Sequence, residues 1–263
     1  MKIVRFALGD VVRFGILQDD AVYPCAGDPF VGLKPEERPV PAQSIKLLSP
    51  IAPPNVICIG LNYKRHVEES KVSFPAVPQL FLKPTTAVCG PDDPIVIPLQ
   101  DTARVDYEVE LAIVIRERAR HISEDEVPKF VLGYTVADDV SAREAQFSDE
   151  QWTRGKSFDT FCPLGPVIET DIDPDRLDLT CRVNGRTLQN SNTSDMIFST
   201  RRLVSFISDC MTLLPGTVIL TGTPEGVGFA RTPPIYLRDG DTVECEIENI
   251  GILRNPVVME ASS

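Results

Sequence analysis

The amino-acid sequence predicts an α+β fold that is dominated by mixed β-sheet. Between residues 50 and 251, short apolar segments of strand length alternate with turns rich in proline and glycine. Only two segments have the apolar spacing or the capping residue of a helix. The strands are too many and the helices too few for a doubly wound parallel sheet, in which helices alternate with strands.

A small β-rich unit is expected at the N-terminus. Alternating apolar runs occupy residues 2–8, 11–17 and 21–24, and a stretch rich in proline and charge follows at residues 32–43. We therefore expect a small N-terminal domain and linker at residues 1–48 and a larger domain at residues 49–263.

The larger domain is expected to consist of strands with two helices. The predicted strands lie at residues 55–61, 79–84, 94–98, 107–115, 133–140, 179–185, 216–224 and 241–251. One predicted helix, residues 123–131, opens with Ser123 as its cap, and the other, residues 199–211, has apolar residues at helical spacing. There is no internal repeat and no low-complexity tract.

Composition argues against several classes of protein. The net charge of −12 argues against nucleic acid or an anionic membrane as a partner, because both attract basic surfaces. No segment approaches the ~20 unbroken apolar residues of a membrane span, and the opening MKIVRFALGD reaches charge and glycine too soon for a signal peptide. We expect a cytoplasmic protein whose 7 scattered cysteines, none in a CxxC pair, stay reduced.

An acidic pattern falls on one predicted strand. Asp106, Glu108 and Glu110 alternate with Tyr107, Val109 and Leu111, so strand geometry directs all three acids to one face. The apolar continuation AIVI predicts that this strand is buried, and Asp138 and Asp139 end a second apolar run. Three converging carboxylates would suit Mg²⁺ or Mn²⁺. The alternative is a half-exposed strand whose polar face is simply acidic.

The two histidines differ in their surroundings. His121 lies among charged residues and is expected at the surface. His66 follows an apolar strand, and if the chain turns helical after Asn62, Glu69 lies three residues away on the same face. A carboxylate in that position orients an imidazole as a general base. The alternative is an incidental pair on a solvated turn.

Other polar residues could contact a ligand. Lys83 ends an apolar strand, Arg143 and Gln146 follow Asp139 by one and two helical turns, and Lys156 lies in RGKSF. Each alone is more often a surface side chain. The glycines of residues 221–228, TGTPEGVG, predict a tight loop close to a ligand, with Thr223 among its donors. This loop lacks the features of a phosphate-binding or dinucleotide-binding motif.

Taken together, these segments resemble the fumarylacetoacetate hydrolase family. The resemblance spans about residues 50 to 258 and rests on the ordered motifs GLNYKRH, LFLKP, DYEVELAIVI, GYTVADDVSAR, KSFDTFCPLGP, NTSDMIF, MTLLPGTVILTGTPEGVG and IGILRNPV. It implies a mixed β-sheet roll as the catalytic domain, a homodimer, and Mg²⁺ or Mn²⁺ as cofactor.

The resemblance also implies roles for particular residues. It implies Glu108, Glu110 and Asp139 as metal ligands, and His66 with Glu69 as a catalytic dyad on a lid. It further implies Lys156 as a catalytic lysine, and Lys83, Arg143, Gln146 and Thr223 as substrate contacts.

The function expected from the sequence is hydrolysis of the C–C bond of an acylpyruvate by a metal-bound enolate route. Isomerisation of a 2-hydroxyhepta-2,4-dienedioate and decarboxylation of oxaloacetate pass through the same enolate and stay as alternatives. All three act on a small anionic 2-oxo acid. A non-catalytic 2-oxo acid binding protein and a structural or interaction protein are alternatives of other classes. The intact His66, Glu69 and Lys156 speak against the former, and the converging acids against the latter.

Overall fold

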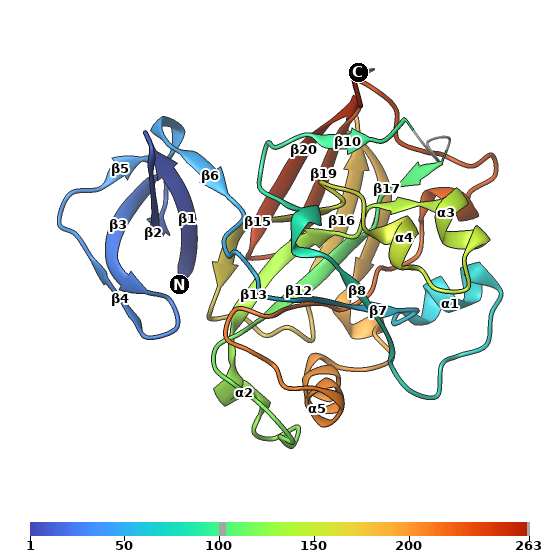
Figure 1. Ribbon diagram of the computed structural model, residues 1–263, viewed down its shortest axis with the longest axis horizontal. Coiled ribbons are helices and arrows are strands. Elements are labelled where there is room, and N and C mark those ends of the chain that lie inside the picture. The colour runs from blue at the N-terminus through green and yellow to red at the C-terminus, as the bar shows by residue number, and fades with distance from the viewer. Residues whose placement is uncertain (100–103, 262–263) are drawn as a thin grey trace.

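The computed structural model describes residues 1–99 and 104–261 of the chain. Within these residues the chain forms a 13-stranded sheet, a 5-stranded sheet and a 2-stranded ladder, with short helices at their margins (Figure 1). The larger sheet contains parallel pairs, such as β18 with β7, and antiparallel pairs, such as β12 with β13. The predicted α+β class with mixed sheet is confirmed.

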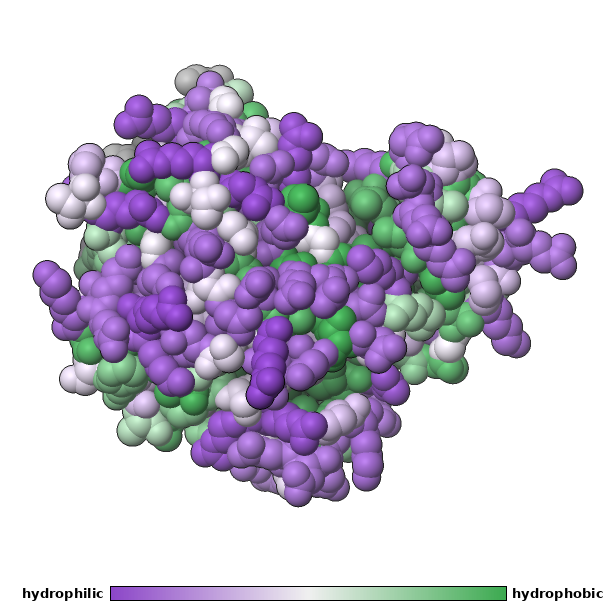
Figure 2. Space-filling view, turned by 180° about the vertical axis from the view of Figure 1, so that it is seen from behind, coloured by the Kyte–Doolittle hydropathy of each residue, from purple (hydrophilic) through white to green (hydrophobic). Residues whose placement is uncertain are grey.

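The first strands form a small unit beside the rest of the molecule (Figure 1). They are β1 (Lys2–Leu8), β2 (Val11–Gln18), β3 (Ala21–Asp28), β4 (Gly32–Pro35), β5 (Val40–Pro41) and β6 (Lys46–Leu48). β1 pairs with β15 (Cys162–Glu169) through Lys2 opposite Glu169 and Ile3 opposite Ile168. The small unit therefore continues the larger sheet. From behind, hydrophobic side chains show where this unit meets the body, while polar side chains cover most of the body (Figure 2).

Two layers of strands make up the body. The central order β15-β13-β12-β18-β7-β8 belongs to the larger sheet, and the second sheet has the order β10-β20-β19-β16-β17. Their bounds are β7 (Val56–Gly60), β8 (Gln79–Lys83), β9 (Val88–Cys89), β10 (Ile95–Ile97), β11 (Val105–Asp106), β12 (Val109–Ile115), β13 (Val131–Asp138), β14 (Ser141–Ala142), β16 (Asp178–Val183), β17 (Arg186–Asn192), β18 (Val218–Leu220), β19 (Thr242–Ile247) and β20 (Gly251–Met259). Between the layers lies a hydrophobic core that includes Leu111, Val136, Leu179, Val243 and Leu253.

Every residue of β12 is buried, as its apolar run VELAIVI predicts. The strand lies between β13 and β18, so its backbone is paired on both sides. Buried on both faces, it is among the strands that the sequence identifies best.

The helices are short. They are α1 (Lys64–Ser70), α2 (Val127–Phe130), α3 (Arg143–Ser148), α4 (Thr153–Lys156) and α5 (Thr200–Cys210), with 3₁₀ turns at Ala42–Ser44, Thr85–Ala87, Thr193–Asp195 and Gly228–Ala230. α5 confirms the predicted helix: Ser199 caps it, and Leu203, Val204 and Ile207 pack onto the sheet. Among the described helices, none has the length and apolar character needed to cross a membrane.

The predicted helix at residues 123–131 was too long. The helix α2 begins only at Val127, because the Ser123 backbone and hydroxyl both donate to the Glu126 carboxylate at 2.9 and 2.8 Å and form a turn before it. α1, α3 and α4 lie together at one end of the sheets (Figure 1). That end holds the polar residues described next.

Candidate active site

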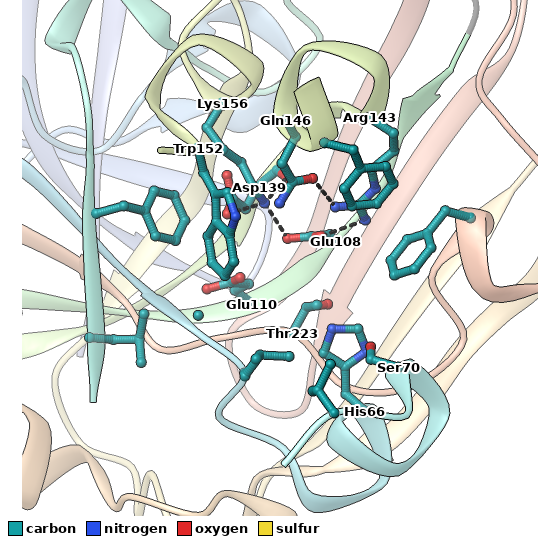
Figure 3. A pocket seen from close by; sticks show the side chains of 17 residues that line it. His66, Ser70, Glu108, Glu110, Asp139, Arg143, Gln146, Trp152, Lys156 and Thr223 are labelled. Atoms are coloured by element: carbon teal, nitrogen blue, oxygen red, sulfur yellow. Dashed lines mark hydrogen bonds and ion pairs between the residues drawn. The ribbon is translucent and has the colours of Figure 1, made fainter. Parts of the chain in front are cut away.

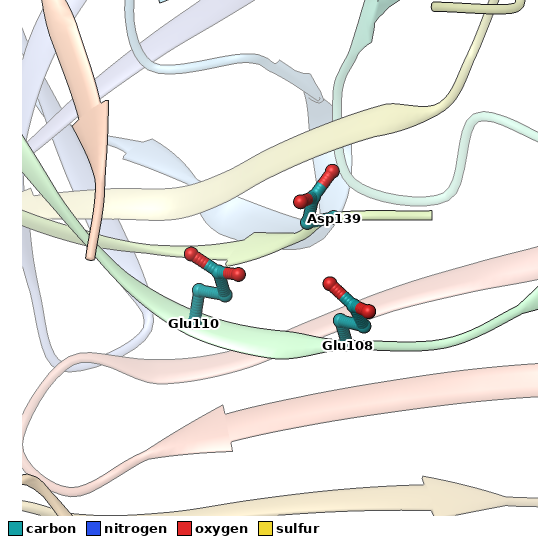
Figure 4. A group of neighbouring side chains, drawn as sticks. All are labelled: Glu108, Glu110 and Asp139. Carbon is teal, nitrogen blue, oxygen red and sulfur yellow. The ribbon is translucent and has the colours of Figure 1, made fainter. Parts of the chain in front are cut away.

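Three carboxylates converge where two paired strands end (Figure 4). Glu110 lies in β12, Glu108 precedes this strand, and Asp139 directly follows β13. The pairing of β12 with β13 brings them together, and the Asp139 N–H donates to the Glu108 carbonyl at 2.9 Å. Each residue offers one carboxylate oxygen, and these oxygens lie within 4.8 Å of one another. We call Glu108, Glu110 and Asp139 the carboxylate triad.

The acids of the triad are buried, and the pKa values of Glu110 and Glu108 are shifted in opposite directions. Burial raises the pKa of Glu110 well above its ordinary value, and the neighbouring charges of Asp139 and Glu108 add to the shift. Burial also opposes ionisation of Glu108, yet the charges of Lys156 and Arg143 lower its pKa to about 2. Together with Asp106, the triad places four buried acids beside three buried cations, Arg143, Lys156 and Lys83, so one negative charge has no cation to balance it when all are ionised.

This donor set fits a divalent cation. Carboxylate oxygens are the ligands that Mg²⁺ and Mn²⁺ prefer, and here three of them meet in a buried site. A bound cation would relieve the repulsion that raises the pKa of Glu110. The Glu110 side chain is also held in place, because its Oε2 accepts from the Gly222 N–H at 2.6 Å.

Two buried lysines lie beside the triad. Lys156, the last residue of α4, places its Nζ 2.7 Å from Glu108 Oε2 and 2.7 Å from Asp139 Oδ2. Lys83, at the end of β8, places its Nζ 2.6 Å from Asp139 Oδ1 and donates to the carbonyls of Val140 and Lys156. Lys156 lines the cavity described below, but Lys83 does not. The geometry assigns Lys83 to holding Asp139 and the backbone, and its expected contact with substrate stays a prediction.

Arg143 and Gln146 lie on α3 and face the triad. The Arg143 guanidinium donates to Asp106 Oδ2 at 2.9 Å, to Glu108 Oε1 at 2.6 Å and to Gln146 Oε1 at 2.8 Å. Arg143 is only 2% exposed. Its nitrogens are therefore engaged by protein groups, and Arg143 positions Glu108 in this structure.

Asp106 anchors a loop beside the site, a role that the sequence pattern did not indicate. It is fully buried, and besides Arg143 it accepts from the N–H groups of Gly228 and Phe229 at 2.8 and 3.0 Å. Asp106 thereby connects the loop that follows β18 to Arg143, which contacts the triad. The alternation of Asp106 with Glu108 and Glu110 was the signal, but the sequence does not separate an anchor from a ligand.

His66 and Glu69 pair on α1. The segment after Asn62 is helical, and His66 Nδ1 lies 3.3 Å from Glu69 Oε2. The Glu69 carboxylate also accepts from the Gly226 N–H at 3.0 and 3.1 Å. Glu69 is held from both sides, and His66, 6% exposed, faces the cavity. His121 lies at the surface, as expected, and pairs with Asp209 at 3.1 Å.

The loop at residues 221–228 supplies several of these contacts. Gly222 and Gly226 have φ values of +99° and +97°, which glycine adopts most readily. Their N–H groups point to Glu110 and Glu69, one on each side of the site. The Thr223 hydroxyl donates to the Val109 carbonyl at 3.0 Å and accepts from Gln189 at 2.8 Å, which fixes the loop against β12. Gln189 lies on the polar strand β17, which the sequence did not predict.

One cavity of ≈ 210 Å³ contains these groups (Figure 3). In Figure 3, Trp152 and Arg143 lie on opposite sides of Glu108, and His66 and Ser70 of α1 lie across the cavity from both of them. The cavity is lined by the triad, by His66, Arg143, Gln146, Lys156 and Thr223, and by the apolar side chains Ile59, Leu61, Val72, Phe81, Phe147, Trp152 and Phe229. The four aromatic side chains of this lining, Phe81, Phe147, Trp152 and Phe229, could not be grouped from the sequence, because they lie far apart along the chain or in separate short segments.

The mixed-sheet fold and this cavity define an enzyme with a carboxylate centre suited to a divalent cation. Residues 55–258 match the family described as fumarylacetoacetate (FAA) hydrolase C-terminal, and residues 1–50 match the one described as Rv2993c-like, N-terminal. The chain belongs to the fumarylacetoacetate hydrolase family, a family of enzymes, as the sequence motifs indicated.

Proteins similar to this chain are named for three different activities: a tautomerase, an isomerase and a hydrolase. The mitochondrial oxaloacetate tautomerase of Rattus norvegicus is 46% identical over 83% of this chain and 71% of its own. The structure of a 2-hydroxyhepta-2,4-diene-1,7-dioate isomerase from Mycobacterium marinum is 43% identical, covers 100% of both chains and has a TM-score of 0.90. That of a fumarylacetoacetate hydrolase from Exiguobacterium antarcticum is 36% identical, covers 99% of this chain and 100% of its own, and has a TM-score of 0.91.

Proposed function

We propose that the chain catalyses proton transfer at C3 of a small 2-oxo acid, interconverting its keto and enol forms, with Mg²⁺ or Mn²⁺ as cofactor. The observation that carries this proposal is the convergence, in one cavity, of the carboxylate triad, the buried cations Arg143 and Lys156, and His66, which Glu69 holds from outside the lining. Relatives named as an oxaloacetate tautomerase and a 2-hydroxyhepta-2,4-diene-1,7-dioate isomerase support it.

The chain's own residues have complementary parts in this proposal. A divalent cation held by Glu108, Glu110 and Asp139 would polarise the 2-oxo group and so acidify C3. Lys156 and Arg143 hold two positive charges beside the triad, and these favour the negative charge of an enolate. Both stay ionised at neutral pH, since the charges of neighbouring acids outweigh burial and raise the pKa of each.

His66 is the proposed proton carrier. With Nδ1 donating to Glu69 Oε2, Nε2 keeps its lone pair and can take a proton from C3. The proton is then returned to oxygen or to another carbon, so no atom is gained or lost. The Gly226 N–H holds Glu69 in the orientation that this tautomer of His66 requires.

Hydrolysis of an acylpyruvate is the second candidate, and the His66–Glu69 pair also favours it. An imidazole oriented by a carboxylate can activate water for attack on a carbonyl, which would release pyruvate and a second acid. The hydrolase name of the relative from Exiguobacterium antarcticum agrees with this candidate. A homodimer, which the resemblance implies, stays a prediction for either reaction.

One set of assays tests both candidates. Purified protein with Mg²⁺ or EDTA is given oxaloacetate, acetylpyruvate, fumarylpyruvate or 2-hydroxyhepta-2,4-dienedioate, and enol absorbance and pyruvate release are followed separately. We expect EDTA-sensitive change in enol absorbance, and a fall of about 10²–10⁴-fold in kcat for His66→Ala, the range for loss of a general base.

His121→Ala is the matched control, because His121 is exposed and does not line the cavity. Its rates should equal those of the wild type. Pyruvate release from acetylpyruvate or fumarylpyruvate at the rate of enol loss would favour hydrolysis over simple proton transfer, whereas pyruvate release from oxaloacetate would indicate decarboxylation. Full activity of His66→Ala, or turnover that EDTA leaves unchanged, would contradict the proposed site.

A further inference from the structure

The Ser70 hydroxyl lies in the cavity without a partner from the protein. Among the described lining residues, the side chains with a hydroxyl are those of Ser70 and Thr223. The Thr223 hydroxyl is bonded on both sides, to the Val109 carbonyl and to Gln189. The Ser70 Oγ is buried and has no hydrogen-bond partner. Because nearly all buried polar groups in proteins are paired, this hydroxyl indicates a partner that enters with the contents of the cavity.

The end of α1 explains why the fold does not use this hydroxyl. The Lys71 N–H donates to the Glu68 carbonyl at 3.1 Å, and Lys71 has the left-handed φ of +56° that closes a helix end. The Val72 N–H donates to the Val67 carbonyl at 3.4 Å. A serine near a helix end often donates to the carbonyl four residues before it, but Ser70 does not. Backbone bonds therefore end the helix, and the Ser70 side chain is left for a ligand.

Ser70 and His66 face the cavity from the same side of α1. They are four residues apart, which places them on one helix face with Cβ atoms about 6 Å apart. Both line the cavity, and in Figure 3 they lie across from Arg143 and Trp152. When C3 of a substrate meets His66, the next carbon, C4, is therefore within reach of Ser70.

We propose that the Ser70 hydroxyl donates to an oxygen on C4 of the substrate and thereby selects 2-oxo acids that carry such an oxygen. Oxaloacetate has this acceptor as a carboxylate, and acylpyruvates have it as a carbonyl. A neutral hydroxyl can donate to either group. Ser70 is a specificity residue and not a proton carrier, because it contacts the group on C4 while His66 acts at C3. The inference rests on the proposed function, since it assumes that the 2-oxo group binds at the carboxylate triad.

Binding of two acids of similar shape tests this contact. Oxaloacetate has two oxygens on C4, and 4-methyl-2-oxopentanoate has two methyl groups there. The Kd of each acid is measured by isothermal titration calorimetry with Mg²⁺ present, for the wild type, Ser70→Ala and Ser70→Thr. Ser70→Ala should raise the Kd of oxaloacetate about tenfold, the order expected for loss of one hydrogen bond to a charged group. It should leave the Kd of 4-methyl-2-oxopentanoate unchanged, and Ser70→Thr, which keeps the hydroxyl, should retain most of the affinity for oxaloacetate.

Steady-state kinetics give a second readout. A contact that is equally strong in the ground state and the transition state affects KM and not kcat. With enol absorbance as the signal, Ser70→Ala should therefore raise the KM for oxaloacetate and for acetylpyruvate about tenfold, with kcat nearly unchanged. A rise confined to oxaloacetate would identify the carboxylate as the group that Ser70 recognises, and a rise confined to acetylpyruvate would identify the carbonyl.

The outcomes separate this inference from the proposed function. Ser70→Ala should fold normally, because the Ser70 hydroxyl makes no hydrogen bond within the protein. If this variant binds and turns over both acids as the wild type does, the inference is overturned and the 2-oxo acid site stands. Equal loss of affinity for oxaloacetate and 4-methyl-2-oxopentanoate would also overturn it, since that loss would come from a displaced helix. If neither acid binds to the Mg²⁺-loaded wild type, the proposed 2-oxo acid site itself fails.

Discussion

Lys83, Arg143 and Lys156 show how much of a site depends on charge pairing between single residues. Lys83 and Arg143, whose substrate contacts stay predictions, each pair with buried acids in the structure. The sequence shows that Lys83 ends a strand and Arg143 begins a helix. It does not show which acid each one pairs with, because that acid lies far away along the chain. The alternating acids were better predicted, because strand geometry alone brings Glu108 and Glu110 to one face.

Asp138 leads to a pH dependence in the metal-free protein. Its Oδ1 accepts from the Glu108 N–H at 2.8 Å, but its Oδ2 is buried without a hydrogen-bond partner. Burial raises the pKa of Asp138 from 3.8 to about 7. Because the folded pKa lies above the unfolded one, folding takes up a proton between these values, and stability is lost as pH rises through that window.

Chemical unfolding in EDTA at several pH values checks this sign. Asp138 should lower the free energy of unfolding by up to about 1.4 kcal/mol per pH unit within the window, the limit for one proton. Glu110, whose pKa burial also raises, adds a fall of the same sign. Asp138→Asn cannot titrate, so its curve should be flatter there. Glu108 has the opposite effect at lower pH: because its pKa is lowered in the folded protein, the free energy of unfolding falls as the pH drops from about 4.5 to about 2. Identical slopes for the two proteins would refute the assignment to Asp138.

Among secondary-structure elements, the apolar strands were predicted well and the polar or interrupted ones were not. β7, β8, β12 and β18 follow from their apolar runs. β15 was missed because two prolines and a glycine interrupt it, and β17 because its sequence RTLQNSN is largely polar. β20 also contains a proline, at position 256, and lies beyond the last strand that the apolar pattern predicts. Pairing with neighbouring strands determines these elements more than their own residues do.

The N-terminus of α5 offers a test at the level of one helix. The Ser199 hydroxyl oxygen accepts from the Arg202 N–H at 3.2 Å and satisfies a donor that the helix leaves unpaired. Ser199→Ala should lower the free energy of unfolding by about 1 kcal/mol, as measured by denaturant titration. Ser199→Asp keeps an acceptor and adds a charge that favours a helix N-terminus, so it should be at least as stable as the wild type. Equal loss in both variants would contradict a capping role.

At the scale of the whole molecule, metal binding and folding should be coupled. The triad unites the ends of two strands, and only the folded chain brings Glu108 and Asp139 together. Free Mg²⁺ at about one hundred times its Kd should therefore stabilise the fold by about 2.7 kcal/mol, raising Tm by several degrees in a thermal melt compared with EDTA.

Glu110→Gln provides the variant for this experiment. Glutamine keeps an acceptor for the Gly222 N–H and removes the carboxyl whose pKa burial already raises, so the fold should persist. The Mg²⁺-dependent rise in Tm should disappear. Glu37→Gln, at an exposed position, should retain the full rise. A Glu110→Gln protein that still responds to Mg²⁺ as the wild type does would remove Glu110 from the ligand set.

The triad lies on or beside paired strands, whereas the aromatic rings of Phe147, Trp152 and Phe229 lie on short helices and loops. This difference affects how the two parts of the site can change in evolution. Glu110 is bound into a strand paired on both sides, and most substitutions there would disturb the sheet. Phe147 and Trp152 belong to short surface segments, where sequence can drift with little penalty. After gene duplication, a descendant can thus acquire a new substrate by changing a few of these aromatic residues while it keeps the carboxylate triad. Relatives nearly half identical to this chain can then diverge in the acids they recognise long before they diverge in fold.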